Sequence, residues 1–330
     1  MKHINLKSII RAVLLVALAA GTIACSDDDL NSKELKIYVS TGLQNHFEMN
    51  LTHTPNVTTG ESVVEFPVRA TRELPADAEI TFALNNDLAD SYNQARGTTY
   101  KVLTEDLVTL LTPTVSIKQG ELISTEQIRV ELSDPTELTA KEGYLIPIAI
   151  KEVLSKDKGL EISTNLSAVY IIITSTIITI ETGIEPGGTV MDRSKWTATA
   201  SNTYTSSYGA ANMIDGKVET SWFGTNTGTS LTFDMGETVK LKGFRITPNY
   251  KGFSPFYNAD KVELFSSADN LEWDSHGIIE IREPSKETSV TNPDYKYARF
   301  YNDTDVRYFR FVSTQVSSYY WGIAEVDAYN

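Results

Sequence analysis

The sequence predicts an all-β protein of two domains. Short segments in which apolar and polar residues alternate recur between residues 35 and 178, as in Glu79–Leu84 and Gln127–Leu132, and such alternation is typical of half-buried strands. A segment rich in Pro and Gly, residues 181–189, interrupts this pattern and predicts a linker. The chain of 330 residues is long enough for two domains of ordinary size, each with its own core.

Residues 1–24 have the pattern of an export signal rather than of a folded element. Three basic residues precede the apolar run Ala12–Ala20, which is too short to span a bilayer. Thr22-Ile23-Ala24-Cys25 then resembles a bacterial lipobox, with Thr22 in place of the usual Leu. The resemblance implies that Cys25 is acylated and becomes the mature N-terminus.

Residues 25–34 are expected to form an acidic tether. Its start, Ser26-Asp27-Asp28-Asp29, is a solvated acidic spacer by composition. It also resembles the export signal that places Bacteroides lipoproteins on the outer leaflet of the outer membrane. We therefore expect a lipid-anchored outer-membrane protein that faces the cell exterior.

The charge of the mature chain makes nucleic acid a poor candidate partner. Three of the 29 Lys and Arg residues leave with the export signal, so that 26 remain against 43 Asp and Glu, a net charge of −17. A chain this acidic repels phosphate backbones and anionic lipid. We expect no nucleic-acid binding, and contact with the membrane only through the lipid anchor. The single cysteine allows no disulfide within the chain.

Residues 35–180 form the first predicted domain. Val169–Ile173 is a continuous apolar, largely β-branched run that favours a strand buried on both faces, and Leu88–Ala95 is the one short helical candidate. Regular spacing of strands and turns predicts a β-sandwich.

Four segments of this domain resemble a domain of unknown function, number 1735, of Bacteroides surface lipoproteins. The resemblance implies an immunoglobulin-like fold with no known chemistry, and we interpret the domain as a spacer. The segments are Ala78–Phe82, Ser91–Tyr100, Val115–Gly120 and Tyr144–Ile148.

In the second predicted domain, residues 190–330, oxygen-bearing side chains gather around one turn. Asp215-Gly216 predicts a tight turn, and Thr220 follows closely. Glu325 joins them if the C-terminal strand lies beside this loop. Calcium takes six to eight such hard oxygen ligands. An Asp-Gly pair by itself is more often only a turn.

Several segments of the second domain resemble the coagulation factor 5/8 type C (discoidin-like) domain family, which includes carbohydrate-binding module family 32. The resemblance implies a jelly-roll β-sandwich and a calcium site that ties the first loop to the last strand. Matched by position, the calcium ligands are the carbonyls of Asn212, Lys217 and Ala324, the carboxylates of Asp215 and Glu325, and the carbonyl and hydroxyl of Thr220. The segments that carry the resemblance are Asn212–Trp222, Leu231–Gly236, Val262–Trp273, Arg307–Phe311 and Ile323–Tyr329.

The family's galactose-binding residues are mostly replaced in this chain. By position, Phe223 stands for a His, Asn249 for an Arg and Ser254 for an Asn, and only the aromatic residue before the last strand remains, as Tyr320. Residues 249–258 and 319–321 are nevertheless rich in aromatic rings, and exposed aromatic patches mark binding sites. The predicted ligand-binding residues are Phe223, Asn249, Tyr250, Phe253, Tyr257 and Tyr320.

Four further aromatic residues are weighed against the core. Trp321 and Phe256 are equally compatible with the core and with the ligand face, since large aromatic side chains are often buried. Trp222 and Trp273 are assigned to the core.

Three classes of function compete. The first is a cell-surface lipoprotein that binds glycans without catalysis, within a polysaccharide or host-glycan uptake system and alongside other proteins of that system. The second is an adhesion or assembly module that binds a protein through the same loops. The third, an enzyme, is disfavoured because His46, His53 and His276 stand in no catalytic motif.

Overall fold

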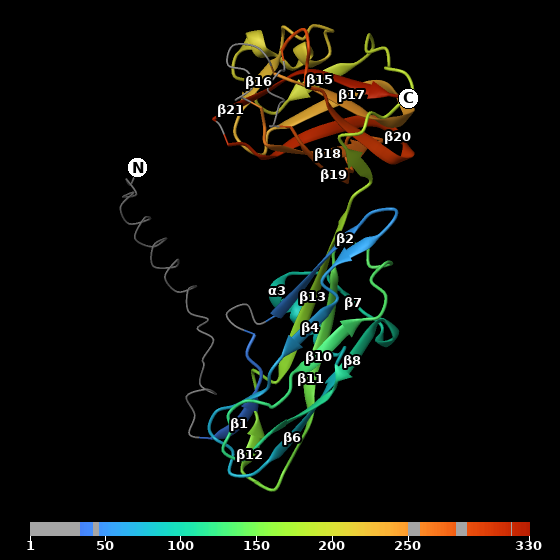
Figure 1. The fold of residues 1–330 in the computed structure, drawn as a ribbon. Coiled ribbons are helices and arrows are strands. Elements are labelled where there is room, and N and C mark those ends of the chain that lie inside the picture. The colour runs from blue at the N-terminus through green and yellow to red at the C-terminus, as the bar shows by residue number, and fades with distance from the viewer. Residues whose placement is uncertain (1–33, 42–45, 250–257, 282–288, 318) are drawn as a thin grey trace, which may run out of the picture. The chain divides into compact units, whose positions relative to one another are not determined.

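The computed structural model describes residues 34–41, 46–249, 258–281, 289–317 and 319–330 (Figure 1). Cys25 and the export signal lie outside the described residues, as do Tyr250, Phe253, Phe256 and Tyr257. In the described parts of the chain, no helix has the length and apolarity needed to cross a membrane.

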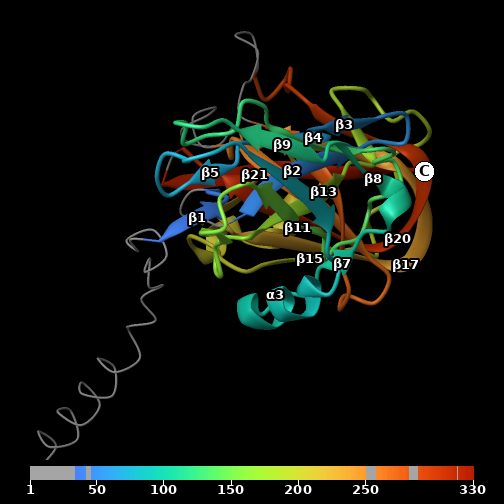
Figure 2. The ribbon, with the colours of Figure 1, turned by 90° about the horizontal axis from the view of Figure 1, so that it is seen from below.

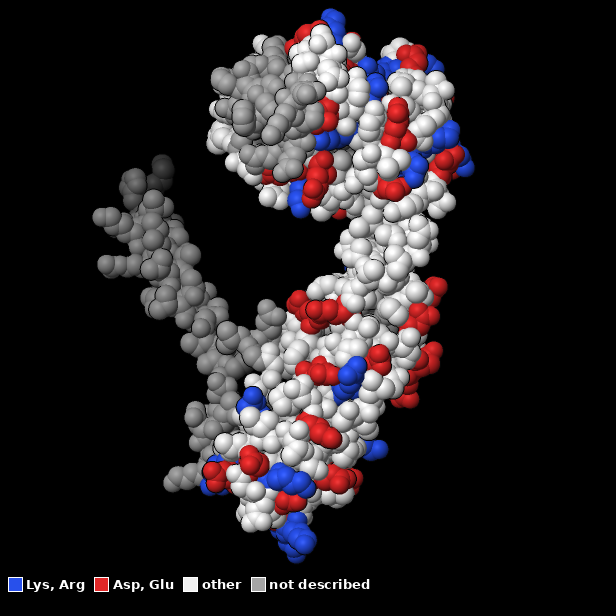
Figure 3. All heavy atoms as spheres, viewed as in Figure 1, with Lys and Arg blue, Asp and Glu red and all other residues white. Residues whose placement is uncertain are grey.

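Strands are the main regular element of the protein and helices are few, which confirms the predicted all-β fold. Two compact units are present, one of residues 1–49, 62–134 and 142–173 and one of residues 50–61, 135–141 and 174–330. Positive and negative side chains are interspersed on the face of the protein that Figure 3 shows.

The N-terminal domain contains one large sheet and two small ones. The seven-stranded sheet has the order β3-β2-β13-β11-β6-β9, with β7 paired to β11, and the three-stranded sheets have the orders β4-β10-β8 and β12-β1-β5. Val169–Ile173 lies within β13, between β2 and β11, and is mostly buried, as predicted. The strands are β1 Leu35–Tyr38, β2 His46–His53, β3 Thr58–Gly60, β4 Val63–Phe66, β5 Arg69–Ala70, β6 Ala78–Leu84, β7 Lys101–Val102, β8 Val108–Thr112, β9 Thr114–Ile117, β10 Ile128–Leu132, β11 Tyr144–Ser155, β12 Leu160–Ile162 and β13 Ala168–Ile177.

The predicted short helix is present as α3, Leu88–Arg96, and a 3-10 turn, η2, covers Glu105–Leu107. Gly97 ends α3 in the left-handed conformation, with φ 65°, which glycine adopts without steric cost. Ala89 and Tyr92 pack on Leu145 and Ile172, so α3 covers one patch of the large sheet. Figure 2 shows α3 at the periphery, next to β7.

The C-terminal domain is built on two long strands, β17 and β20, which are 19 and 20 residues long. Its eight-stranded sheet has the order β16-β21-β17-β20-β18-β19, with β14 paired to β20 and β15 paired to β17. The elements are β14 Ile180–Thr182, β15 Thr197–Ala200, η3 Ser206–Tyr208, η4 Ala210–Met213, β16 Trp222–Thr225, β17 Ser230–Pro248, β18 Lys261–Ser267, β19 Asp274–Glu280, β20 Lys296–Gln315 and β21 Tyr320–Tyr329.

The two long strands bend together, which brings several loops to one end of the domain. The register between β17 and β20 shifts between Asp234 and Val239 and again between Leu241 and Gly243. Only four residues separate β16 from β17, and four separate β20 from β21. The long strands must therefore run away from these short connections and return to them. The connections before β17 and after β20 consequently leave the sandwich at the same end, and β17 also ends there, with Pro248 beside Ile323 of β21.

The predicted linker, residues 181–189, begins too early. Glu181 and Thr182 belong to β14 and pair with Arg299 and Ala298 of β20. Glu181 also forms an ion pair with Arg299. The alternation of a strand as short as β14 covers too few residues to be seen in the sequence.

Large rings fill the core of the C-terminal domain. Trp222 and Trp321 are fully buried and meet edge to face at 4.7 Å, so Trp321 belongs to the core. Phe309 stacks on Phe233 at 4.5 Å. Trp273, assigned to the core from the sequence, is only half-buried. The Arg310 guanidinium lies 3.8 Å from its ring centroid. A cation on the face of an indole is a favourable contact that lets this Trp sit at the surface.

Candidate functional site

The loop after η4 folds around Asp215, as the sequence predicts. Gly216 takes a left-handed conformation with φ 80°, and the backbone N–H of Lys217 donates to Asp215 Oδ1 at 2.9 Å. Thr220 Oγ1 lies 2.9 and 2.8 Å from the two Asp215 oxygens and 2.9 Å from the Lys217 carbonyl oxygen. A hydroxyl has a single proton, so these three oxygens compete for it. Oxygen atoms are thereby crowded against one another, which is an arrangement that a cation stabilises.

Glu325 of β21 reaches the same loop. Its Oε1 accepts a hydrogen bond from the Lys217 N–H at 2.9 Å, so the Asp215 and Glu325 carboxylates share one amide proton. Glu325 is 4% exposed. Its burial raises the pKa of this carboxyl to about 7, although the neighbouring Arg193 acts in the opposite direction. The fold has thus brought two carboxylates to one place with fewer positive partners than they need.

The two remaining predicted ligands lie beside this cluster. Asn212 is in η4, and its side-chain amide donates to the carbonyls of Ser207 and Ser221 at 3.0 and 2.9 Å. Ala324 precedes Glu325 in β21 and is fully buried. The structure therefore gathers Asn212, Asp215, Lys217, Thr220, Ala324 and Glu325 in one region.

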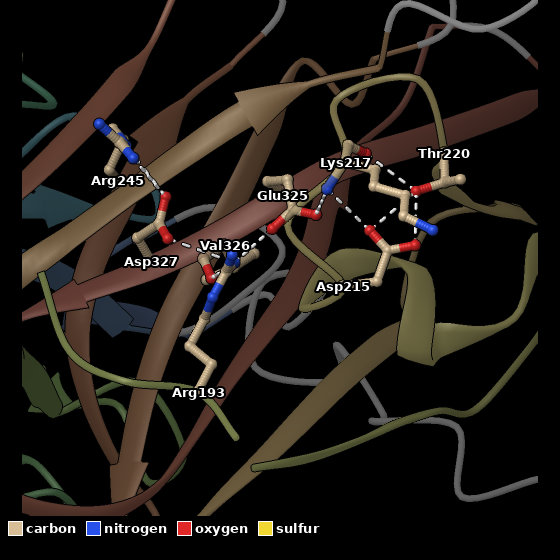
Figure 4. A network of polar contacts seen from close by, with 8 residues as sticks. All are labelled: Arg193, Asp215, Lys217, Thr220, Arg245, Glu325, Val326 and Asp327. Carbon is tan, nitrogen blue, oxygen red and sulfur yellow. Dashed lines mark hydrogen bonds and ion pairs between the residues drawn. The ribbon is translucent and has the colours of Figure 1, made fainter. Parts of the chain in front are cut away.

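A chain of ion pairs continues from Glu325 into the domain (Figure 4). The Arg193 guanidinium contacts Glu325 Oε2, the Val326 carbonyl at 2.9 Å and Asp327 Oδ1 at 3.2 Å. Arg245 binds the other oxygen of Asp327 at 2.8 and 3.0 Å. Sequence reasoning missed Arg193 and Arg245. The available signal was Glu325 and Asp327 themselves, which lie two residues apart on one face of a strand and need cations when buried.

The oxygen cluster fits a hard cation. Its donors are two carboxylates, a hydroxyl and a main-chain carbonyl, the ligand types that Ca²⁺ prefers. Among the described residues no cluster of three His, Cys, Asp or Glu side chains forms, so main-chain oxygens would have to complete the ligand set. A bound Ca²⁺ would hold this loop against β21.

Aromatic rings meet at the end of the domain where the loops converge. Tyr320 lies 4.9 Å from Tyr204 and 6.0 Å from Phe223, measured between ring centroids. Tyr208 lies 5.5 Å from Phe223, and Tyr319 lies 4.7 Å from Tyr320. Tyr204 and Tyr319 are exposed, Tyr208 and Tyr320 are half-buried, and Phe223 is 8% exposed. We call the four tyrosines over Phe223 the aromatic platform.

The platform differs from the predicted ligand face in two ways. Tyr204 and Tyr208 were missed, because they lie in an irregular segment and reach Tyr320 and Phe223 only in the folded chain. Asn249 was predicted to contact ligand, but it is 1% exposed, and its N–H donates to Asn258 Oδ1 at 2.9 Å. Its side chain is held inside the domain. Phe223 forms the floor of the platform, beneath Tyr208 and Tyr320.

A separate groove of about 720 Å³ lies in the same domain. Paired charges line it, such as Lys261 and Glu280 at 3.2 Å, together with Tyr295 and Tyr297. Arg245 lies 4.4 Å from the Tyr295 ring centroid. Other charged side chains of the lining also have partners, as Lys296 has in Asp294 at 3.0 Å.

His276 forms a short Ser–His contact, which is the kind of contact found in some catalytic sites. Its Nε2 lies 2.7 Å from Ser266 Oγ, and its Nδ1 lies 2.6 Å from Thr179 Oγ1. A Ser–His contact can activate a nucleophile, but His276 and Ser266 are both buried, and the third partner is a hydroxyl rather than a carboxylate. Burial lowers the pKa of His276 to about 4. This imidazole is a neutral structural hydrogen-bonding group.

Acid is expected to destabilise the C-terminal domain through His276. The unfolded side chain takes up a proton near pH 6.5, whereas the folded one does so only near pH 4. The contribution of His276 to the free energy of unfolding is therefore complete above pH 6.5. It is lost as the pH falls toward 4, by roughly 3 kcal/mol for this shift in pKa. Denaturation followed by tryptophan fluorescence reports this domain alone, because all four tryptophans, Trp196, Trp222, Trp273 and Trp321, lie in it.

The variant His276→Gln should be less stable at neutral pH and should lose this part of the pH dependence. Equal pH dependence in the variant and the wild type would contradict the assignment.

Comparisons with known proteins agree with the two domains. Residues 197–326 match the model of the F5/8 type C domain family, and residues 30–157 match a family model described as an N-terminal domain. No curated protein matches the chain. A two-domain protein of unknown function from Bacteroides fragilis matches over 100% of both chains, with 17% identity and a TM-score of 0.64. At this identity the likeness shows a shared fold.

Matches to single domains cover 43% of this chain. One is the F5/8 type C domain of a Bacteroides fragilis protein, with 25% identity, 95% of that chain covered and a TM-score of 0.38. Another is the family 32 carbohydrate-binding module of C. perfringens NanJ in complex with galactose, with 21% identity, 98% coverage and a TM-score of 0.37. The match of the family model, together with the loop around Asp215 and the closing strand β21, identifies residues 197–326 of this chain as an F5/8 type C domain.

Proposed function

We propose that this protein is a cell-surface lipoprotein that binds glycans without catalysis through its C-terminal domain, as part of a polysaccharide or host-glycan uptake system. The observation that carries the proposal is the aromatic platform at the loop end of an F5/8 type C domain. This family includes carbohydrate-binding module family 32. In this proposal other glycan-uptake proteins of the outer membrane are partners.

The platform is suited to the apolar faces of sugar rings. Tyrosine offers a broad apolar ring and a hydroxyl that can bond a sugar hydroxyl. Tyr204 and Tyr319 expose their rings to solvent, while Phe223 and Tyr320 hold them from below. None of the platform residues is charged. Stacking would therefore dominate binding, with weak affinity and broad selectivity toward neutral sugars.

Replacing single platform rings should weaken glycan binding without unfolding the domain. For Tyr204→Ala and Tyr320→Ala we expect about a tenfold rise in Kd, since an aromatic contact of this kind contributes on the order of 1 kcal/mol. A glycan array identifies the ligand, and calorimetry with that ligand measures the Kd. Leu271→Ala is the matched control, because Leu271 is 79% exposed and is not part of the platform.

The measurements also separate the competing functions. Full binding in both tyrosine variants would place the site elsewhere. An adhesion or assembly module would be favoured by two results together. The glycan array would show no binding, and a protein partner would be captured by the wild type but not by Tyr204→Ala or Tyr320→Ala. Turnover of any glycan would contradict a purely binding role.

We also propose a structural Ca²⁺ at the oxygen cluster. Asp215, Thr220 and Glu325 would hold the ion with the carbonyls of Asn212, Lys217 and Ala324. A ligand that binds only the folded state stabilises it, by about 2.7 kcal/mol at a hundredfold excess over Kd. Chelator should then lower the melting temperature reported by tryptophan fluorescence, and an unchanged melting temperature would argue against the ion.

The lipid anchor on Cys25 is part of the same proposal and is supported by the sequence of the export signal. The variant Cys25→Ala lacks the thiol that carries the lipid. It should move from the membrane to the soluble fraction, and protease added to intact cells should cut the wild type. Membrane-bound Cys25→Ala, or wild type that resists the protease, would contradict the proposed location.

A further inference from the structure

Arg193 occupies one side of the Glu325 carboxylate, and the proposed calcium site occupies the other. The Arg193 guanidinium contacts Glu325 Oε2, whereas Glu325 Oε1 faces the Lys217 N–H and the Asp215 loop. The Arg193 side chain is 16% exposed. Main-chain and side-chain acceptors hold it in place, the Val326 carbonyl at 2.9 Å and Asp327 Oδ1 at 3.2 Å.

The carboxylates of this region require a positive partner, which can be a metal ion or a positively charged side chain. Asp215 and Glu325 share one amide proton, and a buried carboxylate without a positive partner is strongly destabilising. Asp327 does not need Arg193 for its own neutralisation, because Arg245 binds it through two nitrogens. Of the charges shown in Figure 4, Arg193 is therefore the resident counter-ion of Glu325.

We propose that Arg193 is a built-in substitute for calcium. It keeps the loop docked on β21 in the absence of Ca²⁺, and it weakens Ca²⁺ binding because its positive charge already neutralises Glu325 and repels a second cation nearby. The domain then stays folded where Ca²⁺ is scarce, and Ca²⁺ adds a modest further stabilisation. This inference rests on the proposed calcium site and concerns what sets its affinity.

The test uses the full chain after treatment with chelator, with CaCl₂ as the titrant. Calorimetry gives the Kd, and tryptophan fluorescence gives the melting temperature of the C-terminal domain. Arg193→Met removes the charge and keeps most of the apolar stem. We expect this variant to melt several degrees lower without Ca²⁺, to bind Ca²⁺ about tenfold tighter or more, and to regain more of its melting temperature than the wild type gains.

Four further variants sharpen the result. Arg193→Lys keeps the positive charge and should leave the Kd nearly unchanged. Arg245→Met removes an arginine of the same ion-pair chain that does not touch Glu325, so it should lower the melting temperature without tightening the Kd. Asp215→Ala should abolish Ca²⁺ binding. If Arg193→Met does not fold, Arg193→Gln supplies a neutral hydrogen-bond donor and should show the same tightening.

The outcomes distinguish the inference from the site on which it rests. Wild type that binds Ca²⁺, with equal or weaker binding in the uncharged Arg193 variants, would overturn the role of Arg193 and keep the site. Binding in Arg193→Met but not in the wild type would support complete substitution by the arginine. Absence of binding in all variants would overturn both.

Discussion

Asp327→Asn is expected to destabilise the C-terminal domain by about 3 kcal/mol, because it removes the shared partner of two arginines. The Asp327 carboxylate lies between Arg193 at 3.2 Å and Arg245 at 2.8 Å, and its side chain is 6% exposed. Asparagine has nearly the same shape, so the change tests the charge rather than the packing. Two guanidinium groups would then lie in a largely buried region with only Glu325 to neutralise them.

Denaturant unfolding at neutral pH, followed by tryptophan fluorescence, measures the free energy of unfolding of this domain. Asp303→Asn is the matched control, because Asp303 is exposed, and surface substitutions of this kind change stability by about 0.5 kcal/mol or less. Asp327→Asn and Asp303→Asn with the same stability as the wild type would show that the ion-pair chain contributes little.

The sequence predicted those parts of the site that local patterns encode. Asp215-Gly216 and Thr220 lie within one loop, so turn chemistry brings their oxygens together in any fold that forms the turn. Glu325 joined them because its segment resembles the closing strand of the family. The all-β fold followed in the same way from the period of two in segments such as Glu79–Leu84.

The parts that were missed depend on contacts between distant segments. Arg193 lies 132 residues from Glu325, in a polar stretch with no periodicity of its own. Tyr204 meets Tyr320 across 116 positions, in a segment where only a 3-10 turn is regular. Trp273 was assigned to the core from its residue type, but Arg310 covers its ring at the surface. Such partnerships are set by strand register, which a single sequence does not state.

Strand register also explains how the aromatic platform is supported, because the large rings of β16 lie against glycines. The Phe223 ring lies against Gly322 of the paired strand β21, and the Trp222 ring lies against Gly224 of β16 itself. Phe223 pairs with Gly322 of β21, and Gly224 pairs with Trp321. A Cβ added at Gly322 would lie 2.4 Å from Phe223 Cδ2 and 2.6 Å from the Trp222 carbonyl oxygen. The Phe223 ring thus lies directly over the Gly322 backbone, in space that any side chain would fill.

Gly322→Ala is therefore expected to abolish glycan binding and to destabilise the domain by about 1–3 kcal/mol, the usual cost of overpacking. The ring of Phe223 can rotate away from the new methyl group, but the Trp222 carbonyl is main chain, so β16 and β21 must separate. Displacement of Phe223 removes the floor beneath Tyr208 and Tyr320, whose rings lie 5.5 and 6.0 Å from it. Calorimetry with the array-selected glycan and tryptophan fluorescence measure the two effects.

Two matched variants separate the clash from the loss of the ring. Gly209→Ala adds a methyl group beside Tyr208 at an ordinary distance, 3.6 Å from the Ser206 carbonyl oxygen, and should bind as the wild type does. The double variant Gly322→Ala with Phe223→Leu makes room for the methyl group, so it should regain part of the stability but not the binding. Wild-type affinity in Gly322→Ala would show that the ligand does not depend on Phe223. Recovery of binding in the double variant would show that strand spacing, rather than the Phe223 ring, positions the tyrosines.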